Sequence, residues 1–486
     1  MLTEGKFIVN SKSKTLFKNL GILTISNFSS KLLVFFLVPM YTSVLSTAEY
    51  GIYDLIITTI SVLAPVITLN ITDAVMRYTM DNEINQGEVA LIGLKIISRS
   101  IVIVGIALLM LSHLKEWNNY KEFMFLFFLY YFFYIFYQYF IQLAKGMNKV
   151  KEMGIAGVLG TAIMISMNVL MLIVFKQGLE GFIVANVLAQ AIPTLYLCLG
   201  IKYWNILCGA KLNKCLKREM LLYCLPLIAS VIGWWINSGF DRYVVALFCG
   251  VSANGILSVA YKIPSILNTL QSIFVKAWQI SAIKEYGENS TAKFYGDTFY
   301  VLNVIVCAAC SWLIILSEPL AYLLYLKDFF LAWKLVPFLL LSSVFNCASG
   351  FLGPILAAKK DSKSMALSAI YGSIANIILN VILVVIIGLQ GVTIATVFSS
   401  FIIYYVRKKA VGIDIKIEKY NIMKMTWLLL FVQTIIEIYT SFWFMEIPLM
   451  IIMLVINFKC LIYVYDIVKK IIFRRIKCED NGICSN

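Results

Sequence analysis

Fourteen apolar runs, each about as long as the 17 to 25 residues that a membrane-spanning helix needs, follow one another along the chain. Such a run crosses the bilayer as a helix because a helix satisfies its own backbone polar groups. The approximate spans are 18–41, 50–71, 90–112, 123–143, 154–175, 181–201, 220–240, 254–275, 298–317, 336–357, 366–388, 391–406, 424–443 and 448–468. The sequence therefore predicts an all-α polytopic membrane protein.

Composition agrees with this prediction and excludes a soluble globular protein. The 486 residues are 61% hydrophobic and only 14% charged, and the mean hydropathy is +0.86. The formal charge of +15 does not indicate a nucleic-acid partner, because most of the 41 Lys and Arg residues lie in short loops on one side of the predicted helices. With an even number of spans, this bias places both termini in the cytoplasm.

The chain also repeats itself. Three short matches occur in the same order in the two halves, at nearly constant offsets. The matched pairs are Gly51 and Gly255, Asn168 and Asn380, and Gly181 and Gly391, at offsets of 204, 212 and 210. We therefore expect two parallel six-helix lobes related by an axis along the membrane normal, followed by two extra helices. The expected parts are a cytoplasmic N-terminal segment (1–17), an N-lobe (18–201), a cytoplasmic inter-lobe loop (202–219), a C-lobe (220–406), a cytoplasmic loop (407–423), helices 13–14 (424–468) and a cytoplasmic tail (469–486).

Polar side chains draw a line along the second predicted span. They are Asp54, Thr58, Ser61, Pro65, Thr68 and Thr72, at spacings of three and four residues. The offset of 204 carries this line onto Ser258, Lys262, Ser265, Thr269, Ser272 and Lys276. In the first span, Thr24, Asn27 and Lys31 have similar spacing. These faces are predicted to line a polar interior instead of facing lipid.

Cations lie within or near the predicted spans. A lysine at mid-membrane costs about 2.5 to 3.5 kcal/mol, so Lys31 either faces a wet cavity or a partner, or snorkels or pairs structurally. Lys262 is its deep counterpart in the other half, and Arg77 and Arg242 lie nearer the two ends. A cationic cavity suits phosphate or diphosphate oxygens. Another role stays open for each arginine: Arg77 could instead pair with Asp73, and Arg242 with Asp241, at helix ends.

Two membrane-embedded acids are candidates for ion coupling. Asp54 either pairs with a cation or carries a coupling proton, and Glu437 on the thirteenth span has no partner that the sequence identifies. We find no acid–base pair, activated nucleophile, metal-ligand spacing or phosphate-binding glycine loop. With a single histidine and short loops, the sequence predicts no enzyme, no metal and no cofactor.

Several segments together carry a resemblance to a known family. They read NFSSKLL…P-x-YT…LS-x-x-EYGIYDL…APVITL…DAVMRY, then WWINSGFDRYVV…G-x-x-x-x-GI…SVAYKIPSIL, and then NVILVVIIGLQGVTIATV. They resemble Wzx-type polysaccharide flippases of the multidrug/oligosaccharidyl-lipid/polysaccharide (MOP) exporter superfamily. The resemblance spans helices 1 to 12 and is most specific in the first, second, seventh and eighth.

This resemblance implies a V-shaped, MATE-like transporter in the bacterial inner membrane. Its expected cargo is an undecaprenyl-diphosphate-linked oligosaccharide, moved to the outer leaflet for O-antigen of lipopolysaccharide, capsule or exopolysaccharide. A polysaccharide polymerase and a chain-length regulator are the expected protein partners, and nucleic acid is not a partner. The candidate cavity residues are Asn27, Lys31, Asp54, Thr58, Arg77, Arg242, Lys262 and Ser265.

Two alternatives remain. A cation-coupled drug exporter of the same superfamily would favour a carboxylate where the first helix has Lys31. A membrane-embedded polysaccharide polymerase would need a sizeable outer loop with catalytic residues, and the predicted outer loops are short. A drug-resistance assay and topology mapping, respectively, would reveal them.

Overall fold

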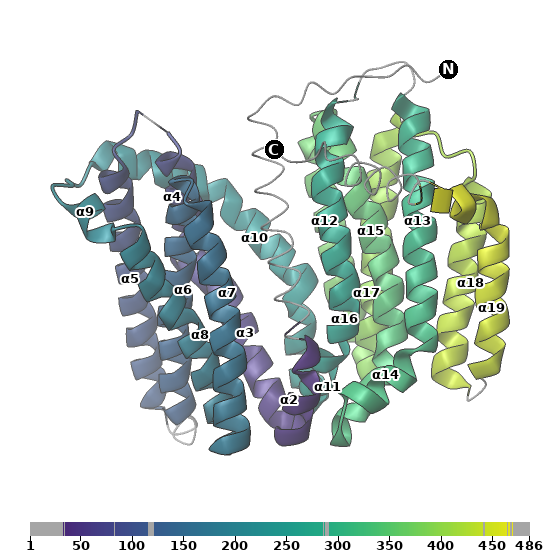
Figure 1. Ribbon diagram of the computed structural model, residues 1–486, viewed down its shortest axis with the longest axis horizontal. Helices are drawn as coiled ribbons and strands as arrows, with labels where there is room; N and C mark the ends of the chain where they lie inside the picture. Colours follow the sequence, from purple (N-terminus) through teal and green to yellow (C-terminus); the bar gives the residue numbers. More distant parts are fainter. Residues whose placement is uncertain are drawn as a thin grey trace, which may run out of the picture. The chain divides into compact units, whose positions relative to one another are not determined.

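The computed structural model describes residues 33, 35–81, 83–114, 121–284, 286, 291–440, 443–463, 465–466 and 469, and its elements there are all helical (Figure 1). Ten helical segments of this part are long and apolar enough to cross a membrane. They are Thr47–Ile67, Gln86–Ser112, Phe123–Gly146, Val150–Val174, Gly178–Gly200, Ala292–Ile315, Lys327–Ala358, Ser362–Ile387, Leu389–Asp414 and Tyr420–Tyr439. The all-helical polytopic prediction is confirmed, and the count of fourteen stays a prediction.

The chain divides into two compact units. The first runs to Tyr243 and includes Val251–Gly255, whereas the second consists of Val244–Gly250 and the chain from Ile256 onward. The division falls within two helices, α10 (Lys214–Phe248) and α11 (Val251–Ala260). The lobe boundaries expected from the sequence stay a prediction.

The first unit is built around α6, which packs against α4, α5 and α8. The helices of this unit before α10 are α2 (Val38–Val44), α3 (Thr47–Ile67), α4 (Ile71–Thr79), α5 (Gln86–Ser112), α6 (Lys121–Gly146), α7 (Val150–Asn168), η2 (Val169–Val174), α8 (Gly178–Gly200) and α9 (Tyr203–Leu207). Aromatic side chains of α6 fill this core, and the buried Tyr139 hydroxyl donates to the Ala90 carbonyl at 2.8 Å. Its ring thus adds apolar area while its polar end is satisfied.

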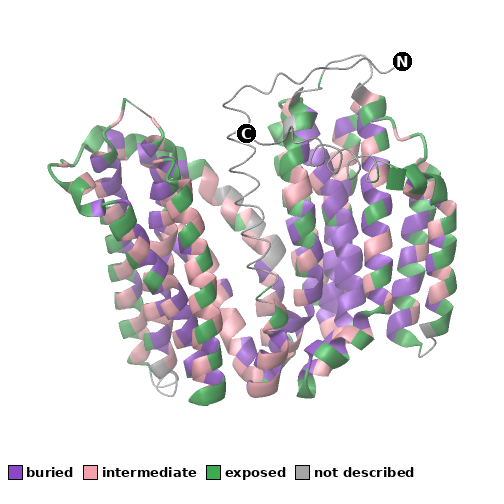
Figure 2. Cartoon of the chain, viewed as in Figure 1, coloured by how far each residue is buried: buried purple, intermediate pink, exposed green. Residues whose placement is uncertain are grey.

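The second unit is built around α15, which is almost wholly buried (Figure 2). Its helices after α11 are α12 (Lys262–Lys284), α13 (Thr291–Ile315), α14 (Ser317–Leu324), η3 (Lys327–Leu335), α15 (Val336–Ala358), α16 (Ser362–Ile387), α17 (Leu389–Val411), η4 (Gly412–Asp414), α18 (Tyr420–Tyr439) and α19 (Trp443–Ile456). Helix α15 contacts α12, α13, α17 and α18. The α18–α19 pair, which lies outside the two predicted repeats, packs on α13.

The second predicted span, 50–71, is not one helix. Helix α3 ends at Ile67, and α4 starts at Ile71. Between them, Leu69 and Asn70 have φ values of +53° and +52°, a left-handed conformation that ends an α-helix. The polar line is therefore cut, and Thr72 lies on a separate helix from Asp54.

The predicted end of the seventh span also needs correction. That span was expected to end at 240, with Arg242 beyond the helix, but α10 continues to Phe248. The consecutive charges of Asp241 and Arg242 suggested a helix end. Arg242 is tolerated within the helix because it pairs with the Asp54 carboxylate.

Candidate functional site

The candidate site is a polar network on α3, and the start of that helix is fixed by a capping box. The Ser46 hydroxyl accepts from the Glu49 backbone N–H at 3.2 Å, and the Glu49 carboxylate accepts from the Ser46 backbone N–H at 2.7 Å. These bonds satisfy backbone donors that a helix start otherwise leaves unpaired. They also fix the residue at which α3 begins, and this start determines the face of the helix on which Asp54 lies two turns later.

Two glycines bring α3 against the first residues of α11. A Cβ added at Gly51 would lie 2.1 Å from the Val251 carbonyl oxygen, and one added at Gly255 would meet the Thr47 carbonyl oxygen. Only glycine allows this backbone approach. Gly51 and Gly255 are the positions matched by the internal repeat, so equivalent points of the two halves touch each other in the first unit.

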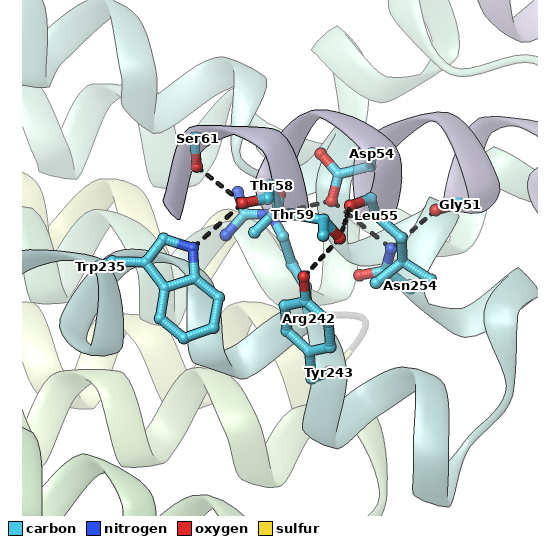
Figure 3. A network of polar contacts seen from close by, with 10 residues as sticks. All are labelled: Gly51, Asp54, Leu55, Thr58, Thr59, Ser61, Trp235, Arg242, Tyr243 and Asn254. Atoms are coloured by element: carbon cyan, nitrogen blue, oxygen red, sulfur yellow. Dashed lines mark hydrogen bonds and ion pairs between the residues drawn. The ribbon is translucent and has the colours of Figure 1, made fainter. Parts of the chain in front are cut away.

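An ion pair lies beside this contact (Figure 3). The Arg242 Nε atom of α10 is 2.8 Å from the Asp54 Oδ2 atom, and each side chain is 16% exposed. The Asn254 amide donates to Asp54 Oδ2 at 3.4 Å and to the Gly51 carbonyl at 3.1 Å. Asp54 thus joins α3, α10 and the start of α11. Of the two interpretations left open for this acid, the structure shows pairing with a cation.

Further polar contacts join α3 to α10 one turn along. The Tyr243 hydroxyl and the Thr59 hydroxyl are 2.6 Å apart, and the Trp235 indole N–H donates to the Thr58 carbonyl at 3.1 Å (Figure 3). The Ser61 hydroxyl donates to the same carbonyl at 2.7 Å. The Ser61 bond stays within α3, so the Trp235 and Tyr243 contacts are the ones that tie α10 to α3 at this level.

The network is electrically balanced. One carboxylate and one guanidinium, both largely withdrawn from solvent, compensate each other's charge. A guanidinium has five N–H donors in a fixed fork, which matches carboxylate and phosphate oxygens equally well. An anionic group that enters this region would therefore compete with Asp54 for Arg242.

Arg77 lies apart from this network in the described part of the first unit. Arg77 is exposed in the last turn of α4, and the Asp73 carboxylate accepts from Asn70 at 2.8 Å and from Gln142 at 3.2 Å. Among the described residues, no ion pair joins Arg77 to Asp73. The helix-end pairing is therefore not seen for Arg77, and Arg242 pairs with Asp54.

The remaining candidates lie elsewhere. Lys31 and Asn27 are outside the described residues. Lys262 is the half-buried first residue of α12 in the second unit, and its carbonyl accepts from the Ser265 hydroxyl at 2.7 Å. Glu437 is buried near the end of α18. In the part of the chain that the structure describes, no group of three or more His, Cys, Asp or Glu residues is placed to hold a metal ion.

Sequence reasoning missed several members of the network. Asn254, Trp235 and Tyr243 were not candidates, although all three lie in the segments that carry the family resemblance. Asn254 directly precedes the repeated glycine, so the repeat alignment could have marked it. The contacts of Trp235 and Tyr243 depend on how α10 lies against α3, and no local pattern encodes that.

Comparisons with known proteins identify both a family and a fold. The sequence matches the family described as polysaccharide biosynthesis protein over residues 16–279, more than half of the chain. No match is found among curated proteins. The structure is similar to that of a lipid II flippase, MurJ, in an inward closed conformation, with a TM-score of 0.67 and 16% identity over 92% of this chain and 100% of that one.

Two further solved structures have the same fold. An inward-facing multidrug resistance MATE family transporter of the MOP superfamily gives a TM-score of 0.63 at 16% identity, over 83% of this chain and 96% of that one. A MOP superfamily transporter from Pyrococcus furiosus gives 0.54 at 14% identity, over 82% and 97%. These likenesses establish the MOP transporter fold that the sequence predicted.

Proposed function

Because the chain belongs to the polysaccharide biosynthesis protein family and has the MOP transporter fold, we propose that it is a Wzx-type flippase for a lipid-linked oligosaccharide. The proposed cargo is an undecaprenyl-diphosphate-linked repeat unit. It moves from the cytoplasmic to the outer leaflet of the bacterial inner membrane, and both protein termini lie in the cytoplasm. The family match over residues 16–279 carries this proposal. The likeness to a lipid II flippase supports a lipid-linked cargo.

The proposed mechanism is alternating access. Cations capture the diphosphate group, the glycan enters a polar interior, the lipid tail stays in the bilayer, and a rearrangement of the lobes re-exposes the cargo outside. Lys31, Arg77, Lys262 and Arg242 are the proposed cationic contacts, with Asn27, Asp54, Thr58 and Ser265 as their polar neighbours. The Asp54–Arg242 pair supports a specific step, in which a phosphate oxygen replaces the Asp54 carboxylate at Arg242. The released Asp54 is then free to take up a coupling ion.

The polymer that this cargo builds would be O-antigen, capsule or another exopolysaccharide. A polymerase and a chain-length regulator would act on the unit after it reaches the outer leaflet. We infer transport and not catalysis for this chain, because its sequence offers no catalytic constellation and the solved structures that share its fold are flippases and transporters.

Deletion of the gene in its native host tests the proposal. Surface polymer should be lost, and single lipid-linked units should accumulate on the inner leaflet. Loss of polymer with single units displayed on the outer leaflet would instead identify a polymerase. An unchanged polymer together with new sensitivity to toxic drugs would identify a drug exporter.

Substitutions at Lys262 test the capture step. Lys262→Gln should abolish export without changing the amount of protein in the membrane, and Lys262→Arg should restore part of it, because charge is needed there more than shape. Lys363→Gln is a matched control, since Lys363 is an exposed lysine in the first turn of α16 and lies off the predicted polar face. Equal export by Lys262→Gln and Lys363→Gln would remove Lys262 from the mechanism.

A further inference from the structure

A second buried polar cluster lies at one end of the α18–α19 pair. Glu437 of α18 is 6% exposed, and Glu446 of α19 is fully buried. Helices α13, α18 and α19 pack together around them, and α14 starts beside them. The whole cluster belongs to the second unit, and Glu446 was not a candidate in the sequence.

The neighbouring polar groups serve Glu437 or each other. The Ser317 hydroxyl donates to Glu437 Oε1 at 2.7 Å. One turn away on α18, Gln433 accepts from the Ser311 hydroxyl at 2.7 Å and donates to the Ser311 carbonyl at 3.2 Å. Ser311, Ser317 and Gln433 are therefore already engaged.

Glu446 differs from these groups because neither of its two buried carboxyl oxygens makes a well-formed hydrogen bond. The Gln433 side chain interacts with it, but that amide already donates to the Ser311 carbonyl. The Glu437 carboxyl also lies within hydrogen-bonding reach, and Glu318 of α14 adds a further negative charge nearby. Two ionised carboxylates cannot hydrogen-bond each other, because both only accept. A buried carboxylate with no donor and a like charge beside it is strongly unfavourable.

Along the described parts of α13 and α18, no cation lies close enough to compensate. On α18, Lys424 is 13 positions from Glu437, about 20 Å along the helix. On α13, Lys293 is 18 positions from Ser311, about 27 Å along the helix. Glu318 is the charged residue that α14 brings to the pair, and it is acidic.

A single proton resolves this arrangement. Bound to one carboxyl, it donates to the other, supplies the missing hydrogen bond and removes one of the two charges. We propose that Glu437 and Glu446 form a proton-binding site in which the two carboxyls share one proton. Because α19 packs only on α13 and α18 among the helices it contacts substantially, loss of that proton would loosen α19 before the rest of the unit.

This site also deepens the proposed function, on which the following step rests. A proton bound from the outer side and released after a change in α18–α19 packing would let a proton gradient drive cargo export. Glu437 and Glu446 would then couple proton binding to cargo export. They are far from Asp54 and Arg242 in the sequence.

Infrared difference spectroscopy of the full-length protein in lipid nanodiscs tests the proton directly. The wild type should show the C=O stretching band of a protonated carboxylic acid at neutral pH, with the expected shift in D₂O. Glu437→Gln and Glu446→Gln should each remove it, because the new amide donates to the remaining carboxylate and lets it ionise. Glu180→Gln, at an exposed glutamate that starts α8, should keep the band.

The wild-type spectrum decides the proposal even if a variant fails to fold. Absence of the band at neutral pH would overturn it, as would a band that persists in both pair variants. Loss of the band on adding NaCl, but not choline chloride, would overturn it in favour of a sodium site. The spectrum needs no cargo, so failure of the flippase proposal and failure of the proton site are separately visible.

Discussion

The Asp54–Arg242 network and the Glu437–Glu446 pair are both buried polar clusters, but they solve the problem of buried charge in opposite ways. In the first, a guanidinium on α10 neutralises a carboxylate on α3 at 2.8 Å, and Asn254 adds a donor. In the second, two carboxyls lie within hydrogen-bonding reach of each other, and neither oxygen of Glu446 makes a well-formed hydrogen bond. One cluster is complete as it stands, whereas the other needs a proton from solution.

This difference predicts different responses to mutation and pH. Removing one member of an opposite-charge pair leaves an uncompensated charge, which is strongly destabilising. Removing one member of a like-charge pair removes a repulsion, which is nearly neutral for folding. The first cluster should therefore stabilise the fold over a wide pH range, whereas the second should make it sensitive to pH.

The largest expected effect comes from the glycine contact that holds the first cluster in place. Gly51→Leu should prevent α3 from approaching α11, because even a Cβ at Gly51 would lie 2.1 Å from a carbonyl oxygen. We expect a loss of more than about 3 kcal/mol, seen as loss of folded protein in size-exclusion chromatography. Gly157→Leu is the matched control, since a Cβ there meets nothing within 4 Å. Equal folding of both variants would contradict the close contact.

Arg242→Met should destabilise the protein by about 3 kcal/mol, because Asp54 is left charged and largely buried. Adding Asp54→Leu should recover part of this loss, because it removes the stranded charge. Thermal unfolding of the wild type, both single variants and the double variant measures the coupling free energy. Additive effects of the two substitutions would show that the pair contributes nothing to stability.

Glu446→Gln should change stability at neutral pH by less than about 1 kcal/mol, because an amide replaces a protonated carboxyl of similar shape. The native pair binds a proton that the unfolded chain releases at neutral pH, so wild-type stability should fall as the pH rises above the range in which ordinary carboxyls titrate. The variant should lose this slope. Unfolding curves across pH for both proteins provide the measurement, and parallel curves would count against the shared proton.

The smallest effect is expected at a surface pair, Lys359 and Asp414, which are 2.9 Å apart with 37% and 24% of their side-chain surface exposed. The hydrogen bond to Asp414 raises the pKa of Lys359. The stabilisation from this raised pKa is therefore present at neutral pH and is lost as the pH rises through the lysine pKa. Lys359→Ala should cost less than about 1 kcal/mol in thermal unfolding, because solvent and salt screen the pair. A larger loss would mean that solvent exposure does not explain why this ion pair should contribute less stability than the Asp54–Arg242 pair.

The fold was predictable because it depends on features that repeat locally. Membrane-length apolar runs and three matched segments sufficed for an all-helical transporter, and the motifs around Gly51 and Gly255 led to the correct superfamily. Helix interruptions were less visible. The break after Ile67 depends on left-handed conformations at Leu69 and Asn70, which the apolar pattern does not reveal.

The candidate site was only partly predictable. Asp54 and Arg242 were both identified, because a charge within an apolar segment needs an explanation. Their pairing was not, since it depends on how α3 and α10 pack. Glu446 escaped notice because it precedes the predicted fourteenth span and looks like a loop residue in the sequence. Its significance becomes clear only when its burial and the lack of a well-formed hydrogen bond to its oxygens are known.

The most direct test of the central claim is cargo movement across a bilayer by the purified protein. Proteoliposomes would carry an undecaprenyl-diphosphate-linked oligosaccharide, and an impermeant glycosidase outside would report the fraction of glycan that is accessible. If the protein is a flippase, the accessible fraction should rise with time in its presence and stay constant in protein-free vesicles. Identical time courses with and without the protein, for units matched to the host's own polymer, would contradict it.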